Sequence, residues 1–530
     1  RDRIERLPLN GRGLLSLLER APGTVVTPAT RGESGQFSAN GQRPNMNTFQ
    51  VDGVSANTGV SGGGLPAQVT GGSMPGMTAI GSLSGLISLD ALNEFLVQTS
   101  TASPDFGRLP GAQVSLSSRS GTNEWHGSVS EYFRNDKLDA NDWFANRLGQ
   151  GSAAMRMNDF GGALGGPVKR DRTFFFVTYE GMRLRQPASW RAAVPTASLR
   201  ERTLGWAGPV LQLFPRANGV QFSEDLAEWT GRSSRPARLD AGTARLDHVF
   251  GPRLSVFGRY NEAPSASQFG SVQLNQLGLS SRSLTGGANL LLRPDTVMDL
   301  RGNFSDASAN SQWGPANKAE FPGCYLQAVA TAFFPAQNAC DYLYRFSIGG
   351  VGQVVNGAES RQRQTQWHLA STLHIAHGAH QVRMGVDWRR LAPRRRDTDG
   401  NLSIIAESLT DFAQTQNLWT ATASRLDRSS TLSEISVFLQ DTWRLGRTLT
   451  ATLGARWELA PAPRTNSLSE NPFGGPASEV ISAVWPMRWD NIAPRLGLAW
   501  RPGEHSRTVV RAGAGLYYDS SLSIATDVVN

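Results

Sequence analysis

The chain contains few of the features that identify an enzyme or a membrane helix. Cysteine occurs twice and histidine seven times in 530 residues, which excludes a cysteine-rich metal framework. No apolar run reaches the ~20 residues that a transmembrane helix needs, and no secretory signal peptide opens the chain. A P-loop and a dinucleotide-binding fingerprint are both missing. The sequence gives no support for enzymatic activity, and we expect no catalytic residue, no cofactor and no metal site.

Basic residues outnumber acidic ones without forming an arm for nucleic acid. The chain carries 52 Lys and Arg against 44 Asp and Glu, a formal net charge of +8. Its densest basic run is only Arg394 to Arg396, and other arginines recur inside alternating segments. This distribution argues against nucleic acid as a partner. It favours arginines that pair with acids or phosphates in a water-filled interior.

The most informative pattern is a strict alternation of apolar and polar residues in the larger, C-terminal part of the chain. In residues 448–459 the leucines and Trp457 share one phase, while the threonines and Arg456 share the other. A period of two predicts a strand with one apolar and one polar face. Residues 381–390 and 297–305 repeat the pattern.

Three features favour a membrane barrel over a soluble sandwich, which also alternates. The predicted strands reach about ten residues, which matches a tilted span of ~9–11. Aromatic residues crowd the strand ends, where a bilayer barrel has its girdles. Short turns alternate with long polar connections, the asymmetry of outer-membrane barrels. These connections, expected to lack regular structure, lie near residues 135–156, 185–239, 261–281, 306–361, 391–430 and 461–490.

About thirteen strands are expected after residue 121. An open edge leaves N–H and C=O groups unsatisfied in lipid, so we expect this chain to cover only part of a barrel. Large barrels with a plugged lumen reach ~22 strands, and the Gly-rich unit before the strands is a natural plug. The predicted fold class is therefore mainly β: an N-terminal α/β plug domain over residues 1–121, then an incomplete antiparallel transmembrane β-barrel over residues 122–530.

The residues at the junction of these two units resemble a known family. Residues 120–128 (SGTNEWHGS) and 131–135 (EYFRN) resemble the plug-to-barrel junction of TonB-dependent outer-membrane receptors, above all their Oar-like branch. Residues 165–169 (GGPVK) and 172–176 (RTFFF) resemble the next hairpin of that branch, and residues 51–54 (VDGV) resemble one of its plug motifs. The resemblance extends over nearly the whole chain.

The resemblance implies a 22-stranded barrel in the bacterial outer membrane, surrounded by lipopolysaccharide and other outer-membrane lipid. It implies that a periplasmic TonB-type protein couples the plug to an inner-membrane energy source, and that the protein takes up a ligand. The alternative is surface adhesion or assistance to secretion on the same scaffold. Siderophore, oligosaccharide, peptide and vitamin are all compatible as ligands. No coupling box and no barrel-closing strands are recognisable between Arg1 and Asn530.

Candidate functional residues come from two regions. The Gly- and Ser-rich stretch of the plug, residues 54–85, has no periodicity and is expected to form an outward loop. Its candidate ligand-facing residues are Asn57, Ser61, Gln68, Ser73 and Met74. In the barrel, the polar phase of the strands supplies the lumen-facing residues His126, Arg134, Arg245, Arg259, Arg301, Arg383 and Arg456. We expect most of these to hold the plug and a few to contact the ligand.

Three local motifs have both a functional and a purely structural interpretation. Cys324 and Cys340 lie in a stretch without strand pattern; a disulfide in an oxidising compartment is the prediction, and two free thiols are the alternative. The HxxHxxH array at 374–380 could hold a metal, but neither carboxylate nor cysteine joins it, which favours solvated histidines. Residues 397–401 (DTDGN) partly match a calcium loop, yet the glycine is misplaced, which favours a plain turn.

Overall fold

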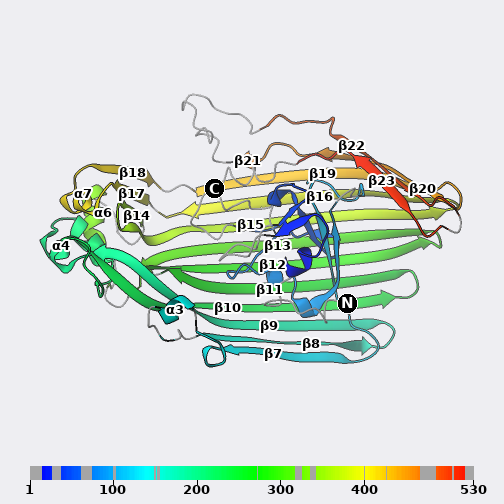
Figure 1. The fold of residues 1–530 in the computed structure, drawn as a ribbon. Helices are drawn as coiled ribbons and strands as arrows, with labels where there is room; N and C mark the ends of the chain where they lie inside the picture. Colours follow the sequence, from blue (N-terminus) through cyan, green and yellow to red (C-terminus); the bar gives the residue numbers. More distant parts are fainter. Residues whose placement is uncertain are drawn as a thin grey trace.

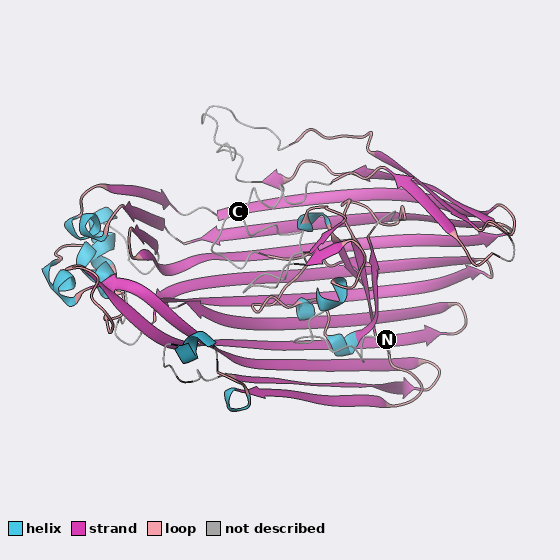
Figure 2. Cartoon of the chain, in the orientation of Figure 1, coloured by secondary structure: helices cyan, strands magenta, loops and turns pink. Residues whose placement is uncertain are grey.

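The computed structural model describes most of the chain, and its described residues are 15–26, 37–60, 75–99, 103–141, 143–147, 151, 155–270, 272–316, 321, 325–334, 342–398, 400–424, 427–465, 485–503 and 506–519. Strands dominate this part of the chain, and the helices are short (Figure 2). Among the described residues, no helix is long and apolar enough to cross a membrane. Cys324 and Cys340 lie outside the described residues, as do Ser61, Gln68, Ser73 and Met74.

The N-terminal domain is built on a four-stranded sheet in the order β4-β3-β6-β5. Its strands are β3 (Thr48–Val51), β4 (Val54–Ser55), β5 (Leu92–Gln98) and β6 (Gln113–Ser118). The flanking elements are α2 (Leu15–Leu18), β1 (Thr24–Val26), β2 (Phe37–Ala39), η2 (Pro44–Met46), η3 (Leu83–Gly85) and η4 (Leu89–Ala91). Burial alternates along β3 and β6, so that one face of the sheet supplies Phe49, Val114 and Leu116 to a core shared with Leu18 and Ile87. We call this domain the plug.

The barrel wall consists, in the described residues, of thirteen strands, each antiparallel to the next. This confirms the mainly-β fold class. Four further strands, described below, belong to the same sheet, so it has more strands than the expected thirteen. The wall strands are β7 (His126–Asn135), β8 (Arg156–Lys169), β9 (Thr173–Pro195), β10 (Leu226–Phe250), β11 (Leu254–Gly270), β12 (Gln273–Arg293), β13 (Thr296–Pro315), β15 (Gly352–His377), β16 (His380–Asp397), β19 (Asp427–Arg444), β20 (Leu449–Leu459), β22 (Ile492–Trp500) and β23 (Val510–Gly515).

The two faces of the wall have opposite chemistry. On β15, Trp367 and Leu369 are each 52% exposed, whereas Gln366 and His368 between them are 0% and 1% exposed. Apolar side chains therefore point out of the wall and polar ones point in, which is the reverse of a soluble protein and the arrangement of a transmembrane barrel. Figure 1 looks onto the inner face of the wall, with the plug in front of it.

Four of the connections expected to be aperiodic, residues 185–239, 261–281, 306–361 and 391–430, contain strands, so the expectation was wrong for them. Strands β9, β10 and β15 run 23, 25 and 26 residues, deep into the predicted loops. Beyond them lie β14 (Tyr342–Ile348), β17 (Gly400–Ala406), β18 (Leu418–Ser424), α4 (Ala197–Arg202), α5 (Ala207–Gln212), α6 (Gln327–Phe333) and α7 (Leu409–Gln414), which we call the outer cap (Figure 1). The remaining elements are η5 (Asp136–Leu138), α3 (Trp143–Arg147) and β21 (Arg464–Thr465).

The outer cap has an apolar core of its own. Tyr344 and Phe346 of β14 pack with Leu211, Val329 and Phe412, which come from three different helices. Strand β14 is buried on both faces only at its start, Tyr342–Tyr344, and it pairs in parallel with β17. Its apolar–polar alternation covers only Tyr344–Ile348, and the core residues come from segments far apart in the sequence. For these reasons the pattern of any one connection does not predict the cap.

Candidate functional site

The plug and the wall meet through two clusters of buried charged side chains. The first surrounds Asp52, in the turn between β3 and β4. Asp52 and Gly53 have φ angles of 53° and 80°, as in the tight hairpin turn that Asp-Gly favours. The turn presents the carboxylate to the wall, where Arg259 Nε lies 2.7 Å and Arg245 Nη1 3.5 Å away. Ser118 of β6 donates its backbone N–H to the same carboxylate at 2.8 Å.

This first cluster is almost dry. The side chains of Asp52 and Arg259 are only 5% and 2% exposed. Removing two charges from water is tolerated when their other polar atoms also find partners. Arg259 Nη2 donates to Thr285 at 3.3 Å, whereas its buried Nη1 has no hydrogen-bond partner among the described residues. Arg245 is paired with Asp247 at 2.7 Å. Two guanidinium groups thus face two carboxylates, and the plug is joined to β10, β11 and β12.

The second cluster is centred on Arg108, in the loop before β6. Arg108 has a left-handed φ of 71°. Its guanidinium donates two hydrogen bonds to Asp387, at 2.6 and 3.1 Å, and its Nε lies 3.2 Å from Glu434. Its backbone N–H donates to Glu458 at 2.8 Å. Burial by itself would lower the pKa of Arg108, but the Asp387 and Glu434 carboxylates raise that pKa above its ordinary value, so Arg108 stays charged.

Wall residues complete the second cluster and balance its charge. Each is bonded to one of the carboxylates: His368 to Asp387 at 2.7 Å, Arg389 to Glu434 at 2.7 Å and Arg456 to Glu458 at 2.7 Å. The cluster therefore contains three guanidinium groups and three carboxylates. Because its charges balance, no net charge is buried between the plug and strands β15, β16, β19 and β20.

Two further plug segments contact the wall through polar groups. Ser55 of edge strand β4 donates its N–H to His368 Nδ1 at 2.8 Å, and its carbonyl accepts from Gln366 at 2.8 Å. The wall thus covers backbone groups that an edge strand would otherwise leave unpaired. In residues 103–108, Asp105 pairs with Arg383 at 2.7 Å, and the carbonyl of Ser103 accepts from Arg495 at 2.6 Å.

Gly107 lies where the plug backbone approaches wall residues Arg456 and Glu458 closely. A Cβ on Gly107 would overlap Arg456 Nε and Glu458 Oε1. We expect Gly107→Ala to lower the free energy of unfolding by about 1–3 kcal/mol, because the neighbours are already packed and paired. Urea titration of the purified protein in detergent would measure the loss. Gly258→Ala is the matched control, since a Cβ there meets nothing within 4 Å; equal losses for both variants would contradict the close approach.

A cavity of about 350 Å³ opens beside the second cluster. Plug residue Arg108 and wall residues Glu434 and Glu458 form part of its lining, together with Trp485 and Arg488. A molecule in this cavity would touch the plug and the wall at once. It would also compete for the carboxylates that hold Arg108.

The structure separates the lumen-facing candidates into two groups. Arg245, Arg259 and Arg383 contact plug residues, as described above. Arg456 does so too, because its Nη1 donates to the plug carbonyl of Pro104 at 3.3 Å. Arg301 is paired with Asp299 at 3.4 Å and lies beside the plug turn, where a Cβ on Gly53 would be 3.6 Å from its Cγ.

His126 and Arg134 form the second group. Their register on β8 places them on the same face as Ala163, which packs against the plug core. Each lies near a carboxylate close by in the chain: His126 is 3.8 Å from Glu124, and Arg134 is 2.8 Å from Asp139.

Asn57 has a role that its position in a Gly-rich stretch did not indicate. It is 1% exposed. Its side-chain oxygen accepts from Phe49 N at 2.7 Å, and its amide nitrogen donates to Asn47 O at 3.0 Å. Asn57 therefore joins backbone segments within the plug.

Three comparisons with known proteins agree with this geometry. Residues 117–205 and 205–528 match the model of the family described as outer membrane beta barrel domain. The chain is 22% identical over 570 aligned positions to the TonB-dependent transporter Oar of Myxococcus xanthus, covering 96% of this chain and 49% of that protein. The chain thus spans about half the length of this curated relative.

Two solved structures share the fold. The outer membrane transporter YddB from Escherichia coli superposes with a TM-score of 0.62 at 13% identity, covering 98% of this chain and 61% of that one. The siderophore receptor PirA from Acinetobacter baumannii gives a TM-score of 0.53 at 12% identity, covering 97% and 59%. At these identities the likeness concerns the fold.

Proposed function

This chain belongs to the outer membrane beta barrel family and is similar to the TonB-dependent transporter Oar; from that premise we propose that it takes up a ligand through its plugged barrel. In this proposal an inner-membrane energy source acts on the plug through a periplasmic TonB-type protein. The ligand binds from the outside, the plug is displaced, and the ligand passes along the inner face of the wall.

The character of the plug–wall contact carries this proposal. Two clusters of ion pairs and several single hydrogen bonds join the plug to the wall. Apolar contacts add to them, such as Leu109 with Leu391 and Leu432, and Ala79 with Leu277 and Ala307. When a polar contact separates, both sides regain hydrogen bonds to water, so its net cost is well below its gross strength. Separating an apolar core of the same size would expose its whole area to water. A contact of this kind holds the plug at rest and still permits its displacement.

The cavity beside Arg108 supplies a route from ligand to plug. A bound ligand that interacts with Glu434 or Glu458 would weaken their hold on Arg108. A ligand shifts a conformational equilibrium only if its affinity differs between the two states. Here the states are the seated and the displaced plug, and the affinity would differ because the lining of the cavity includes residues of both domains. The structural relative PirA is a siderophore receptor, so a siderophore is one ligand class to test.

A disulfide between plug and wall tests whether uptake requires displacement of the plug. Ser88 Oγ of the plug lies 3.2 Å from Thr178 Oγ1 of the wall, so the variant Ser88→Cys/Thr178→Cys places two thiols within bonding reach. Uptake of labelled siderophore, oligosaccharide, peptide and vitamin would be measured in cells. We expect the uptake of the transported compound to stop when the disulfide forms, to return on reduction, and to stop when a protonophore collapses the proton-motive force.

The control disulfide joins two wall strands only. Ser280 and Ser308 are directly opposite in the register of β12 and β13, so Ser280→Cys/Ser308→Cys cross-links the wall and leaves the plug free. Uptake should continue in this variant. Uptake that persists with the plug cross-linked, or that ignores the protonophore, would contradict the transport function.

The outer cap favours adhesion as the second candidate function. Its buried aromatic core, with Phe346 and Phe412 both 0% exposed, makes a folded unit of what would otherwise be flexible loops. A rigid outer surface is suited to binding another surface. Cell attachment that is lost on deletion of the gene, but is unchanged by the plug–wall disulfide, would support adhesion over uptake.

A further inference from the structure

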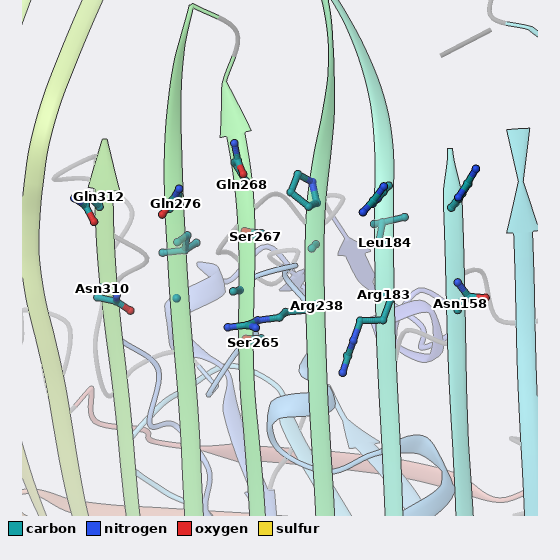
Figure 3. Close-up of a pocket in the computed structure, with 17 residues that line it drawn as sticks. Asn158, Arg183, Leu184, Arg238, Ser265, Ser267, Gln268, Gln276, Asn310 and Gln312 are labelled. Atoms are coloured by element: carbon teal, nitrogen blue, oxygen red, sulfur yellow. The ribbon is translucent and has the colours of Figure 1, made fainter. Parts of the chain in front are cut away.

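A hollow of about 770 Å³ lies on strands β8 to β13, and its location shows that it does not belong to the ligand pathway (Figure 3). Ser265 Oγ accepts from Ala79 N at 2.8 Å, and Ser267 Oγ donates to Ala79 O at 2.7 Å. Ala79 is a plug residue, so these two β11 side chains point inward. Ala266 and Gln268, which alternate with them, therefore point outward.

The strand register shows which residues of the neighbouring strands also face outward. Ala266 is paired with Arg238 of β10, and Arg238 with Arg183 of β9. On the other side, Ala266 is paired with Gly278 of β12, and Gly278 with Asn310 of β13. Paired residues share one face of a sheet. The side chains around the hollow thus stand on the outer face, and in Figure 3 the pale blue plug lies behind the strands.

Small residues form the floor of the hollow and cationic ones surround it. At the centre of the hollow the outward-facing residues are Pro236, Ala266 and Gly278, which carry no long side chain to fill it. Four arginines line the hollow, together with side-chain amides, and no Asp or Glu is among its described lining residues. These arginines are Arg156, Arg183, Arg185 and Arg238, all of them exposed. The hollow is therefore a concave, positively charged site.

The hollow lies just beyond the apolar band of the wall. Val177 and Tyr179 of β9 are exposed outward-facing side chains of that band, and Arg183 follows Tyr179 by four residues. Four residues extend about 13 Å along a strand. At the usual tilt of ~40° this places Arg183 about 10 Å from Tyr179 along the membrane normal. A row of ion pairs marks this level: Arg183 with Asp240 (2.7 Å), Arg282 with Glu262 (2.8 Å) and Arg363 with Asp306 (2.8 Å).

We propose that this hollow binds the phosphate-bearing headgroup of a lipid of the outer leaflet. Guanidinium groups bind phosphate through paired hydrogen bonds, and basic pockets at the headgroup level of a membrane protein take anionic lipid heads. The amides of Gln268, Gln276 and Asn310 supply donors and acceptors for hydroxyl groups on the same headgroup. The acyl chains would then lie along the apolar side chains of the band, next to Val177.

The test compares lipids that differ only in phosphate. The purified chain in detergent would be incubated with lipopolysaccharide, with the same lipid after enzymatic removal of its phosphates, and with inorganic phosphate as competitor. Bound lipid would be counted by native mass spectrometry. We expect retention of the phosphorylated lipid, at least tenfold weaker retention of the dephosphorylated one, and no displacement by inorganic phosphate at the same molar concentration.

Matched variants connect the binding to this hollow. Arg185→Gln/Arg238→Gln should reduce retention at least tenfold, and Arg185→Lys/Arg238→Lys should restore part of it because charge is kept without the paired geometry. Arg363→Gln, on the same face but outside the hollow, should leave retention unchanged. Heat-modifiable gel migration shows that each variant is folded. Equal retention of both lipids, displacement by inorganic phosphate alone, or normal retention by the double Gln variant in a folded protein would overturn the proposal.

Discussion

Replacing Arg108 by alanine is expected to lower the free energy of unfolding of the plug by about 3–5 kcal/mol. The substitution leaves Asp387 and Glu434 buried with one cation fewer, and breaking a buried ion pair from one side has a cost of this order. The side chains of these three residues are 9%, 14% and 3% exposed, so water cannot easily replace the lost contacts. Hydrogen exchange across residues 103–118 would show the change as faster opening of the plug at unchanged barrel protection.

Arg363→Ala is the control for this prediction. Arg363 also pairs with a carboxylate, Asp306, at 2.8 Å, but its side chain is 64% exposed on the outer face. Exposed pairs contribute about 0–1 kcal/mol, so the plug should be unaffected. A similar small effect from both substitutions would show that Arg108 does not hold the plug.

Replacing Asp52 by alanine is expected to have an effect of similar size on the opposite side of the plug sheet. Arg259, with 2% of its side chain exposed, loses the carboxylate 2.7 Å away. The N–H of Ser118 loses its acceptor as well, and an unsatisfied buried donor adds its own penalty. The expected loss is about 3–5 kcal/mol, measured by the same hydrogen exchange. Asp306→Ala, which removes an outward-facing carboxylate, should leave plug protection at the wild-type level.

Combining Arg108→Ala with Asp52→Ala tests whether the two clusters are independent. The two clusters have no residue in common, so the losses in the free energy of unfolding should add within about 0.5 kcal/mol. The sum, about 6–10 kcal/mol, is comparable to the whole stability of a small domain. The double variant should therefore lose its plug from the wall while the barrel stays folded. In planar bilayers it should conduct ions where the wild type does not. A blocked channel would show that other contacts suffice to hold the plug.

The wall strands could be predicted from the sequence because each one carries its own pattern. The alternation in residues 448–459 corresponds to β20, which spans Leu449–Leu459. Strand β14 could not be predicted in this way. Its Tyr342-Leu343-Tyr344 run is buried on both faces, so the apolar–polar alternation is confined to Tyr344–Ile348. The strand also depends on parallel pairing with the distant β17.

The candidate site was predictable on one side only. Strand phase sets Arg245, Arg259, Arg383 and Arg456 on the inner face without any knowledge of the plug. Their partners could not be predicted, because they depend on how the plug is seated. Arg108 and Asp387 are separated by 279 positions, and Arg108 lies in a loop with no periodicity. The turn at Asp52-Gly53 was not predicted from the sequence, and nothing local indicated that the Asp52 carboxylate binds two wall arginines.

The length of β10 has a consequence for what can touch this protein in a living cell. Its 25 residues extend about 80 Å at 3.3 Å per residue, or about 60 Å along the membrane normal at a tilt of ~40°. The apolar band of an outer-membrane barrel is only about 25 Å tall. With short turns on the other rim, most of the remainder projects outward and carries the cap clear of the lipid headgroups. Antibodies, bacteriophages and neighbouring cells would therefore meet the cap first, and selection by them acts on the cap while the plug below is shielded.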